Sequence, residues 1–280
     1  MKKYLNCLLL LIATIAISIC KITRHSKDIF SKHYPFVEAN KGLMIDFPEN
    51  TLLSINKSIL QNIESVRLDI WITKDDVPIT ASATNGVLDR IYNNQANISE
   101  LTLQEVKRIK TVKLGEVIPS LEEVLKLISP SSLFLTLNLP KHHPKQRKIL
   151  QNVLGLLSNF HLMDRAQLSS EDFTYFELLQ EYEKEKNQHV IFGFLYNKGT
   201  KETNVEFGKP GNVIELWWGD VKSSIVSKAH ENKMAVTTYF TEEEKENIES
   251  YRKLFDLKAD IIVCTRPQLL DVFRYTIINK

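Results

Sequence analysis

Short apolar runs alternate with longer amphipathic segments along most of the chain. Eight of the apolar runs have the length and composition of buried strands: 34–39, 66–72, 133–139, 165–169, 189–195, 212–217, 234–239 and 259–264. Seven segments have the spacing of helices with one apolar face: 49–62, 120–128, 144–159, 172–186, 220–232, 241–256 and 266–277. Strands that alternate with helices in this way predict an α/β protein, a (β/α)8 TIM barrel. A doubly wound open sheet is the alternative, because periodicity does not show whether a sheet closes.

Two segments stand apart from this alternation. Residues 77–118 are long and irregular, and we expect them to form an insertion on the barrel. Residues 4–20 carry no charge and are rich in Leu and Ile. As a helix they would span about 26 Å, the lower edge of what crosses a bilayer.

The chain is therefore expected to have two parts, an N-terminal hydrophobic helix within residues 1–27 and a barrel over residues 33–280. Basic residues flank the apolar run on both sides, which argues against a buried helix of a soluble domain. We predict that the first part is an uncleaved, single-pass membrane anchor. A cleaved signal peptide is the alternative, and it would leave a secreted or lumenal protein.

Composition narrows the classes of function. The chain has 36 basic and 34 acidic residues, a net charge of +2, which argues against a nucleic-acid partner. Of three cysteines only Cys264 lies in the barrel region, so no disulfide framework is expected. Nothing in the sequence indicates an oligomeric state.

In a TIM barrel the chemistry lies at the carboxyl ends of the strands. The motifs at and near these ends follow one another in a characteristic order: FPENTL at 47–52, VRLDI at 66–70, TKDDVPI at 73–79, LDR at 88–90, ISELT at 98–102, IPSLEEVL at 118–125 and ADIIVCTRP at 259–267. In order and spacing the chain resembles the glycerophosphodiester phosphodiesterase family. The apolar N-terminus is similar to that of membrane-anchored members that act on lysophospholipids.

The resemblance implies a phosphodiesterase barrel with two histidines as acid and base, an arginine at the phosphate, and a divalent cation, Ca²⁺ or Mg²⁺, held by three carboxylates. A cation neutralises the charge that develops on a phosphodiester, and a proton donor helps the alkoxide leave. Histidine suits both proton transfers because its pKa lies near neutrality.

The family's histidine and arginine positions hold other residues here. Asn40 and Lys41 precede Gly42 where the family has histidine and arginine, and Ser82 stands at the second histidine position. Asparagine and serine do not exchange protons usefully near neutral pH. Each lost proton-transfer group costs roughly 10²–10⁴ in rate.

The family's carboxylate positions are also replaced. They hold Arg67, Asp69 and Thr136, so that only Asp69 is retained, and Asn138 stands at the family's lysine position. One carboxylate is a poor cage for Ca²⁺ or Mg²⁺, and we predict that the chain binds no catalytic metal. Arg67 and Asp69 lie on the same face of their strand at period two, so an ion pair between them could replace the metal.

Other residues could still contribute to a site. Lys41 could meet a phosphate, although a solvated loop lysine is equally plausible, and Trp218 could wall a lipid or glycerol pocket. Glu49 could be a functional acid, but a carboxylate at a helix start explains it. His142 and His143 could replace the lost histidines, but their lysine-rich surroundings favour a solvated loop.

Three hypotheses follow. The first, which we favour, is a pseudoenzyme: a membrane-anchored, catalytically impaired relative that keeps a pocket for a phosphodiester or lysolipid. The second is an active, metal-dependent phosphodiesterase that uses Lys41, Asp69 and His142 or His143. The third is a non-catalytic interaction domain whose barrel is filled.

Overall fold

The computed structural model describes residues 35–207, 211–241, 244 and 246–278. The predicted N-terminal hydrophobic helix, within residues 1–27, lies outside the described residues. Within those ranges, none of the helices has the length and apolar character needed to cross a membrane.

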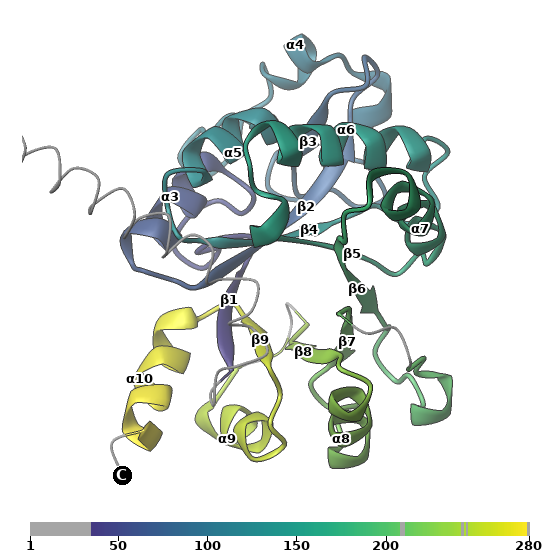
Figure 1. Cartoon of the computed structure of the whole chain (residues 1–280). Coiled ribbons are helices and arrows are strands. Elements are labelled where there is room, and N and C mark those ends of the chain that lie inside the picture. Colours follow the sequence, from purple (N-terminus) through teal and green to yellow (C-terminus); the bar gives the residue numbers. More distant parts are fainter. Residues whose placement is uncertain (1–34, 208–210, 242–243, 245, 279–280) are drawn as a thin grey trace, which may run out of the picture.

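Eight parallel strands close into a barrel, which confirms the TIM-barrel prediction and shows that the open-sheet alternative is wrong (Figure 1). β1 pairs with both β2 and β9, so the sheet has no free edge at this point. The barrel strands are β1 (Phe36–Asn40), β2 (Ser65–Ile72), β4 (Phe134–Asn138), β5 (Ala166–Ser170), β6 (Ile191–Leu195), β7 (Val213–Trp217), β8 (Ala235–Tyr239) and β9 (Ile261–Cys264).

Helices surround the barrel and bury apolar faces against its outer surface. They are α3 (Leu52–Leu60), α5 (Leu121–Ile128), α6 (Gln146–Asn159), α7 (Thr174–Lys186), α8 (Ser223–Glu231), α9 (Ile248–Asp256) and α10 (Pro267–Ile278). Ser120 and Glu123 form the capping box expected at the start of α5. The predicted helix 241–256 was too long, because α9 begins only at Ile248, where Asn247 supplies its own capping box with Ser250.

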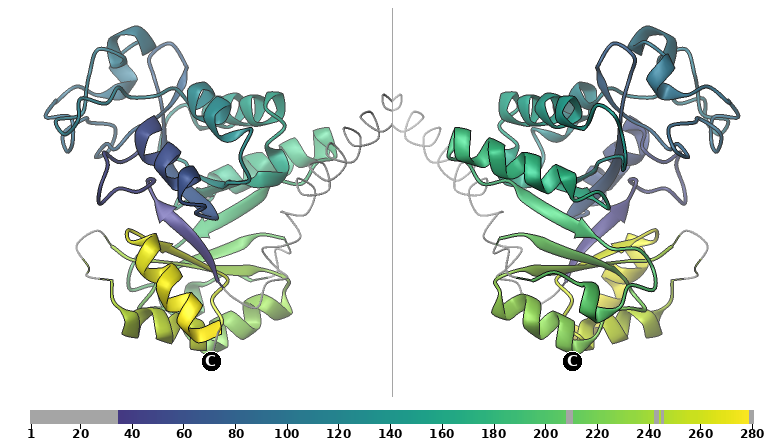
Figure 2. Two further views of the ribbon diagram at one scale, coloured as in Figure 1. Left: turned by 90° about the vertical axis from the view of Figure 1, so that its left-hand side faces the viewer. Right: turned by 90° about the vertical axis from the view of Figure 1, so that its right-hand side faces the viewer.

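The insertion adds a short strand, β3 (Pro78–Thr80), antiparallel to β2, a 3-10 turn, η1 (Ile98–Glu100), and a short helix, α4 (Leu103–Val106). It has its own small core, which packs against Trp71 of β2. Figure 2 shows the insertion, in blue, as a projection at the edge of the barrel. The expectation of an insertion here is confirmed.

The interior of the barrel is layered along its axis. An apolar layer closes the amino-terminal end of the strands: Phe36, Phe134, Ile191, Val213, Ala235 and Ile261. In the next layer along the barrel axis, Glu38, Arg67, Thr136 and Glu215 are buried together as a polar layer. Two residues further along the strands, the side chains reach the mouth at the carboxyl ends of the strands, where the family's chemistry is expected.

Candidate functional site

The turn after β1 places Lys41 inside the mouth. Lys41 has φ of 54° and Gly42 has φ of 80°, and a Cβ on Gly42 would lie 2.5 Å from Ser54 Oγ. Glycine is therefore required at this bend. The Lys41 side chain is buried, with Nζ 3.5 Å from Glu49 Oε2 and 3.5 Å from Asp69 Oδ2. The interpretation of Lys41 as a solvated loop lysine is wrong.

Glu49 belongs to this cluster rather than to a helix start. It is buried, it lies before α3, and its second oxygen is 3.4 Å from Arg90 Nη2 of the insertion. The helix-start explanation of Glu49 is therefore wrong. Two carboxylates, Glu49 and Asp69, flank one lysine.

Asn50 binds the same carboxylate oxygen of Asp69 as Lys41 does, and it also holds the Asp69 backbone. It is buried with φ of 57°, a left-handed conformation that asparagine tolerates better than most residues. Its Nδ2 lies 3.2 Å from Asp69 Oδ2 and 2.8 Å from Ser82 Oγ, and its Oδ1 accepts a 3.0 Å hydrogen bond from the Asp69 amide. Asn138 donates to Asp69 Oδ1 at 3.0 Å. Sequence reasoning gave Asn50 no role, although the FPENTL motif contains it.

The two positions that correspond to the family's histidines lie close to this cluster. Asn40 is half-buried at the end of β1, paired in register with Arg67 of β2. Ser82 is buried, accepts from Asn50, and its backbone N–H donates to Tyr92 Oη at 3.4 Å. Neither an amide nor an aliphatic hydroxyl changes charge near neutral pH.

Arg67 does not pair with Asp69, so the predicted ion pair between these two residues is wrong. Its Nε lies 3.0 Å from Glu38 Oε1, and its Nη2 lies 2.6 Å from Glu215 Oε2. Both carboxylates raise the pKa of the guanidinium, and they more than offset its burial. Burial raises the pKa of Glu215, although Arg67 opposes this. The contacts with Glu38 and Glu215 place the guanidinium in the polar layer, deeper inside the barrel than the residues at the carboxyl ends of the strands.

Thr136 belongs to the same polar layer. Its Oγ1 donates to Glu38 Oε2 at 2.6 Å, as does Ser65 Oγ, also at 2.6 Å. Sequence reasoning missed Glu38 and Glu215 as partners of Arg67. A charged residue within each of these apolar strand patterns was the available signal.

The donors around Asp69 do not fit a divalent cation. Its oxygens face two amide N–H groups and an ammonium, and all three groups offer protons rather than lone pairs. Within the described ranges, no group of three or more His, Cys, Asp or Glu side chains is arranged to hold a metal.

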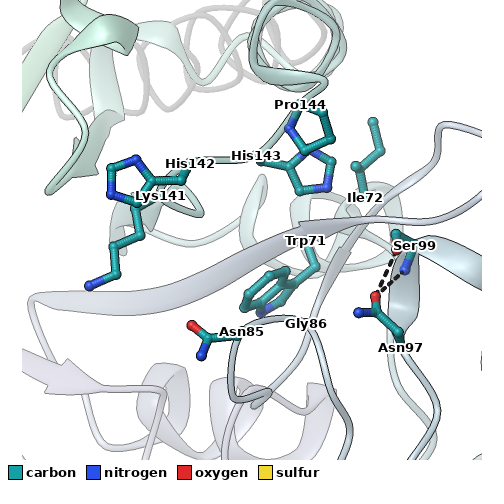
Figure 3. A pocket seen from close by; sticks show the side chains of 10 residues that line it. All are labelled: Trp71, Ile72, Asn85, Gly86, Asn97, Ser99, Lys141, His142, His143 and Pro144. Carbon is teal, nitrogen blue, oxygen red and sulfur yellow. Dashed lines mark hydrogen bonds between the residues drawn. The ribbon is translucent and has the colours of Figure 1, made fainter.

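Two cavities open at this face. One, of about 200 Å³, is lined by Asp69, Asn138 and Glu171 together with apolar residues of β2 and the β4–α6 connection. The other, of about 340 Å³, lies between the insertion and the same connection (Figure 3). Trp71, Asn85 and Lys141 line both cavities, so the two adjoin.

His142 and His143 line the larger cavity, not the one that contains Asp69. The His142 side chain is 84% exposed, with Nδ1 3.5 Å from Asp172 Oδ2. His143 Nδ1 accepts a 3.1 Å hydrogen bond from the backbone of Lys145, and burial together with the Lys145 charge lowers its pKa.

The two tryptophans at the carboxyl end of β7, Trp217 and Trp218, lie outside the lining of both cavities. Trp218 stacks on Phe240 at 5.6 Å between ring centroids and packs against the core. Trp217 donates to Glu244 at 2.8 Å, and Lys198 Nζ lies 4.3 Å from the centroid of the Trp217 ring. The pocket-wall role expected of Trp218 therefore finds no support in these two cavities.

A closed parallel barrel with its polar cluster at the carboxyl ends of the strands defines the class of TIM-barrel proteins whose sites lie at that face. The sequence profile of the glycerophosphoryl diester phosphodiesterase family matches residues 41–269. The chain belongs to this family.

Curated relatives match only part of the chain. A glycerophosphodiester phosphodiesterase of Bacillus altitudinis is 28% identical over 139 residues, 47% of this chain and 56% of the relative. Glycerophosphodiester phosphodiesterase 1 of Mus musculus is 26% identical over 123 residues, 41% and 37% of the two chains. The matches thus span about half the length of these relatives or less.

Solved structures show the same fold over most of the chain. A proposed glycerophosphodiester phosphodiesterase of Galdieria sulphuraria superposes with a TM-score of 0.75 at 24% identity, covering 85% of this chain and 97% of that one. A phosphodiesterase of Oleispira antarctica in complex with the product sn-glycerol-3-phosphate gives a TM-score of 0.74 at 19% identity, covering 88% and 99%.

Proposed function

We propose that this protein is a catalytically impaired member of its family, which binds a glycerophosphodiester or lysophospholipid headgroup at the barrel mouth without hydrolysing it. The observation that carries the proposal is the position of Lys41. Its ammonium lies 3.5 Å from both Glu49 and Asp69. A cation of the chain itself thus neutralises the one carboxylate retained from the family's metal set.

The remaining positions support the same conclusion. Asn40 and Ser82 stand where the resemblance places the acid and base, and neither can supply or remove a proton near neutral pH. Arg67 and Thr136 stand at the other two carboxylate positions, and both donate to Glu38 in the polar layer. These positions therefore supply neither the carboxylates that would hold a catalytic cation nor a group that would transfer a proton.

The cavities support binding. Together they have the size of an ordinary small-molecule site, and their common wall offers the indole of Trp71, the amide of Asn85 and the ammonium of Lys141. An ammonium and an amide can donate to phosphate oxygens, while an indole can cover an apolar or cationic portion of the ligand.

The test is a pair of measurements on the full chain. With glycerophosphocholine or lysophosphatidylcholine and excess Ca²⁺ or Mg²⁺, we expect no hydrolysis above background. With the same compounds, calorimetry should show binding that Trp71→Ala weakens and that Trp218→Ala leaves unchanged. Metal-dependent hydrolysis abolished by Asp69→Ala would contradict the proposal. Absence of binding would favour the third hypothesis, an interaction domain.

A second candidate is an active phosphodiesterase that uses relocated groups. One observation favours it: His142 and His143 line a cavity that adjoins the one containing Asp69. If this candidate is correct, hydrolysis should be measurable, and His142→Gln or His143→Gln should reduce it by roughly 10²–10⁴. His161→Gln is the matched control, because His161 is exposed in the α6–β5 connection, at the opposite end of the barrel strands.

The N-terminal segment bears on where this function occurs. We propose that residues 1–27 anchor the barrel to a membrane, because residues 4–20 are uncharged and basic residues flank them. Membrane fractions should then retain the full-length chain after carbonate washing. A shortened, soluble product would instead support signal cleavage and a secreted or lumenal protein.

A further inference from the structure

Exposed apolar side chains gather on two loops at the rim of the barrel mouth. Eight large apolar residues are exposed in the part of the chain that the structure describes, and four of them lie here. Val112 is 72% exposed, Leu114 61%, Ile45 50% and Val117 36%. Such a concentration is unusual, because exposed apolar residues are normally scattered singly.

The insertion loop that carries three of these residues has a fixed shape. Lys110 and Val117 form a β-bridge at its base, and Thr111 N donates to Glu116 O at 2.9 Å. Leu114 has φ of 67°, a left-handed conformation that costs a leucine conformational energy. The loop therefore holds its apolar side chains in solvent rather than exposing them through disorder.

Lys113 joins this loop to the mouth. Its Nζ donates to the backbone oxygen of Asp46 at 2.8 Å, and Asp46 follows the exposed Ile45 in the connection after β1. The apolar tip of the insertion and Ile45 thus lie at the same rim, on the face where the strands end. We call Ile45, Val112, Leu114 and Val117 the rim patch.

The patch is flanked by positive charge. Residues 106–117 contain four basic side chains, Lys107, Arg108, Lys110 and Lys113, and one acidic side chain, Glu116. Lys107 pairs with Glu123, and Asp46 adjoins Ile45, so one positive charge remains in excess around the rim patch. Arg108, Lys110 and Lys113 are exposed.

We propose that the rim patch docks on an anionic lipid surface. Aliphatic side chains on a projecting loop can enter the headgroup region, while neighbouring lysines pair with anionic headgroups. Docking at this rim would turn the barrel mouth toward the bilayer. Docking of the rim patch requires neither hydrolysis nor a ligand bound at the barrel mouth, so it can be tested independently of the proposed function.

The apolar N-terminus could itself bind vesicles, so sedimentation alone would not test the rim patch. Hydrogen exchange of the full chain on vesicles, read by mass spectrometry, separates the two contributions. We expect amides of residues 110–117 to exchange more slowly on anionic vesicles than on vesicles of pure phosphatidylcholine. The anionic vesicles contain phosphatidylcholine with about 30% phosphatidylserine, which gives a surface potential at least as negative as about −30 mV. Salt at about 1 M should remove the difference, because it shortens the screening length to about 3 Å.

Variants distinguish the patch from the rest of the surface. The double variant Val112→Ser, Leu114→Ser should lose the protection, and Lys110→Glu should weaken lipid binding of the loop by at least roughly fivefold. Val272→Ser is the matched control, since Val272 is 64% exposed on α10. Protection that is equal on both lipids, or unchanged in the double variant, would overturn the proposal.

Discussion

Arg67 of β2 and Glu215 of β7 meet inside the barrel, with 2.6 Å between Nη2 and Oε2, although their strands are not neighbours in the sheet. The same guanidinium binds Glu38 of β1. One arginine thus links three strands across the barrel axis, and it is the shared ion-pair partner of two carboxylates that are removed from water.

Arg67→Met should destabilise the protein strongly. It would leave Glu38 and Glu215 buried together without their counter-ion, at a cost of roughly 3–5 kcal/mol in the free energy of unfolding. Urea denaturation measures this loss. Because burial already raises the pKa of Glu215, the variant should recover part of its stability as pH falls, when that carboxyl group takes up a proton.

The control for this variant is Arg147→Met. Arg147 forms an ion pair with Glu181, but both side chains are 61% exposed, and such pairs contribute about 1 kcal/mol or less. Equal urea midpoints for the two variants would contradict the importance assigned to the polar layer.

Restoring the family's carboxylate by Arg67→Glu alone should fail. The substitution would place a third carboxylate beside Glu38 and Glu215 in the polar layer, where like charges are costly and water is excluded. We expect little soluble, folded protein by circular dichroism. The triple variant Glu38→Gln, Arg67→Glu, Glu215→Gln should recover folding, because only one carboxylate then remains. A stable single variant would show that the layer tolerates reversion.

Gly193 of β6 gives an independent test of the same layer. A Cβ at this position would lie 1.8 Å from Glu215 Oε1 and 2.5 Å from Gln167 Nε2. Gly193→Ala should therefore displace the Glu215 carboxylate and cost roughly 1–3 kcal/mol by overpacking. Gly155→Ala, in α6 with nothing within 4 Å of the added Cβ, should instead stabilise the helix by about 0.5–1 kcal/mol. Thermal unfolding of both variants checks the two opposite signs.

The sequence predicts the barrel well because strand and helix periods are local properties. All eight barrel strands overlap the apolar runs, and helix-start chemistry marks α5 correctly at Ser120. Two acidic residues after Thr241 suggested a helix start there, and this prediction is wrong. The capping box of Asn247 and Ser250 starts the helix instead.

The site was less predictable because its pairs are not local. The alternation of side chains along a strand places Arg67 and Asp69 on the same face, inside the barrel. It does not show which residues of other strands lie in the same layer. Arg67 is paired in register with Asn40 and Thr136, and its carboxylate partners come from β1 and β7. Lys41 reaches Asp69 only because of a left-handed turn. Strand register and turn conformation depend on the whole barrel.

His230 should make stability depend on pH near neutrality. At the end of α8 its Nε2 lies 2.9 Å from Asp260 Oδ2, and this hydrogen bond, with the Asp260 charge, raises the pKa of His230 above its usual 6.5 despite partial burial. A raised pKa in the folded state means that the contribution is complete below pH 6.5 and disappears as pH rises through the folded-state pKa. His230→Gln should therefore lower the melting temperature more at pH 6 than at pH 9. The difference should be modest, because the imidazole is 39% exposed.

Ser227→Ala is the control. Ser227 is exposed on the same helix and has no titratable group, so this variant should shift the melting temperature equally at both pH values. An equal shift for His230→Gln would show that the pair does not hold α8 against β9.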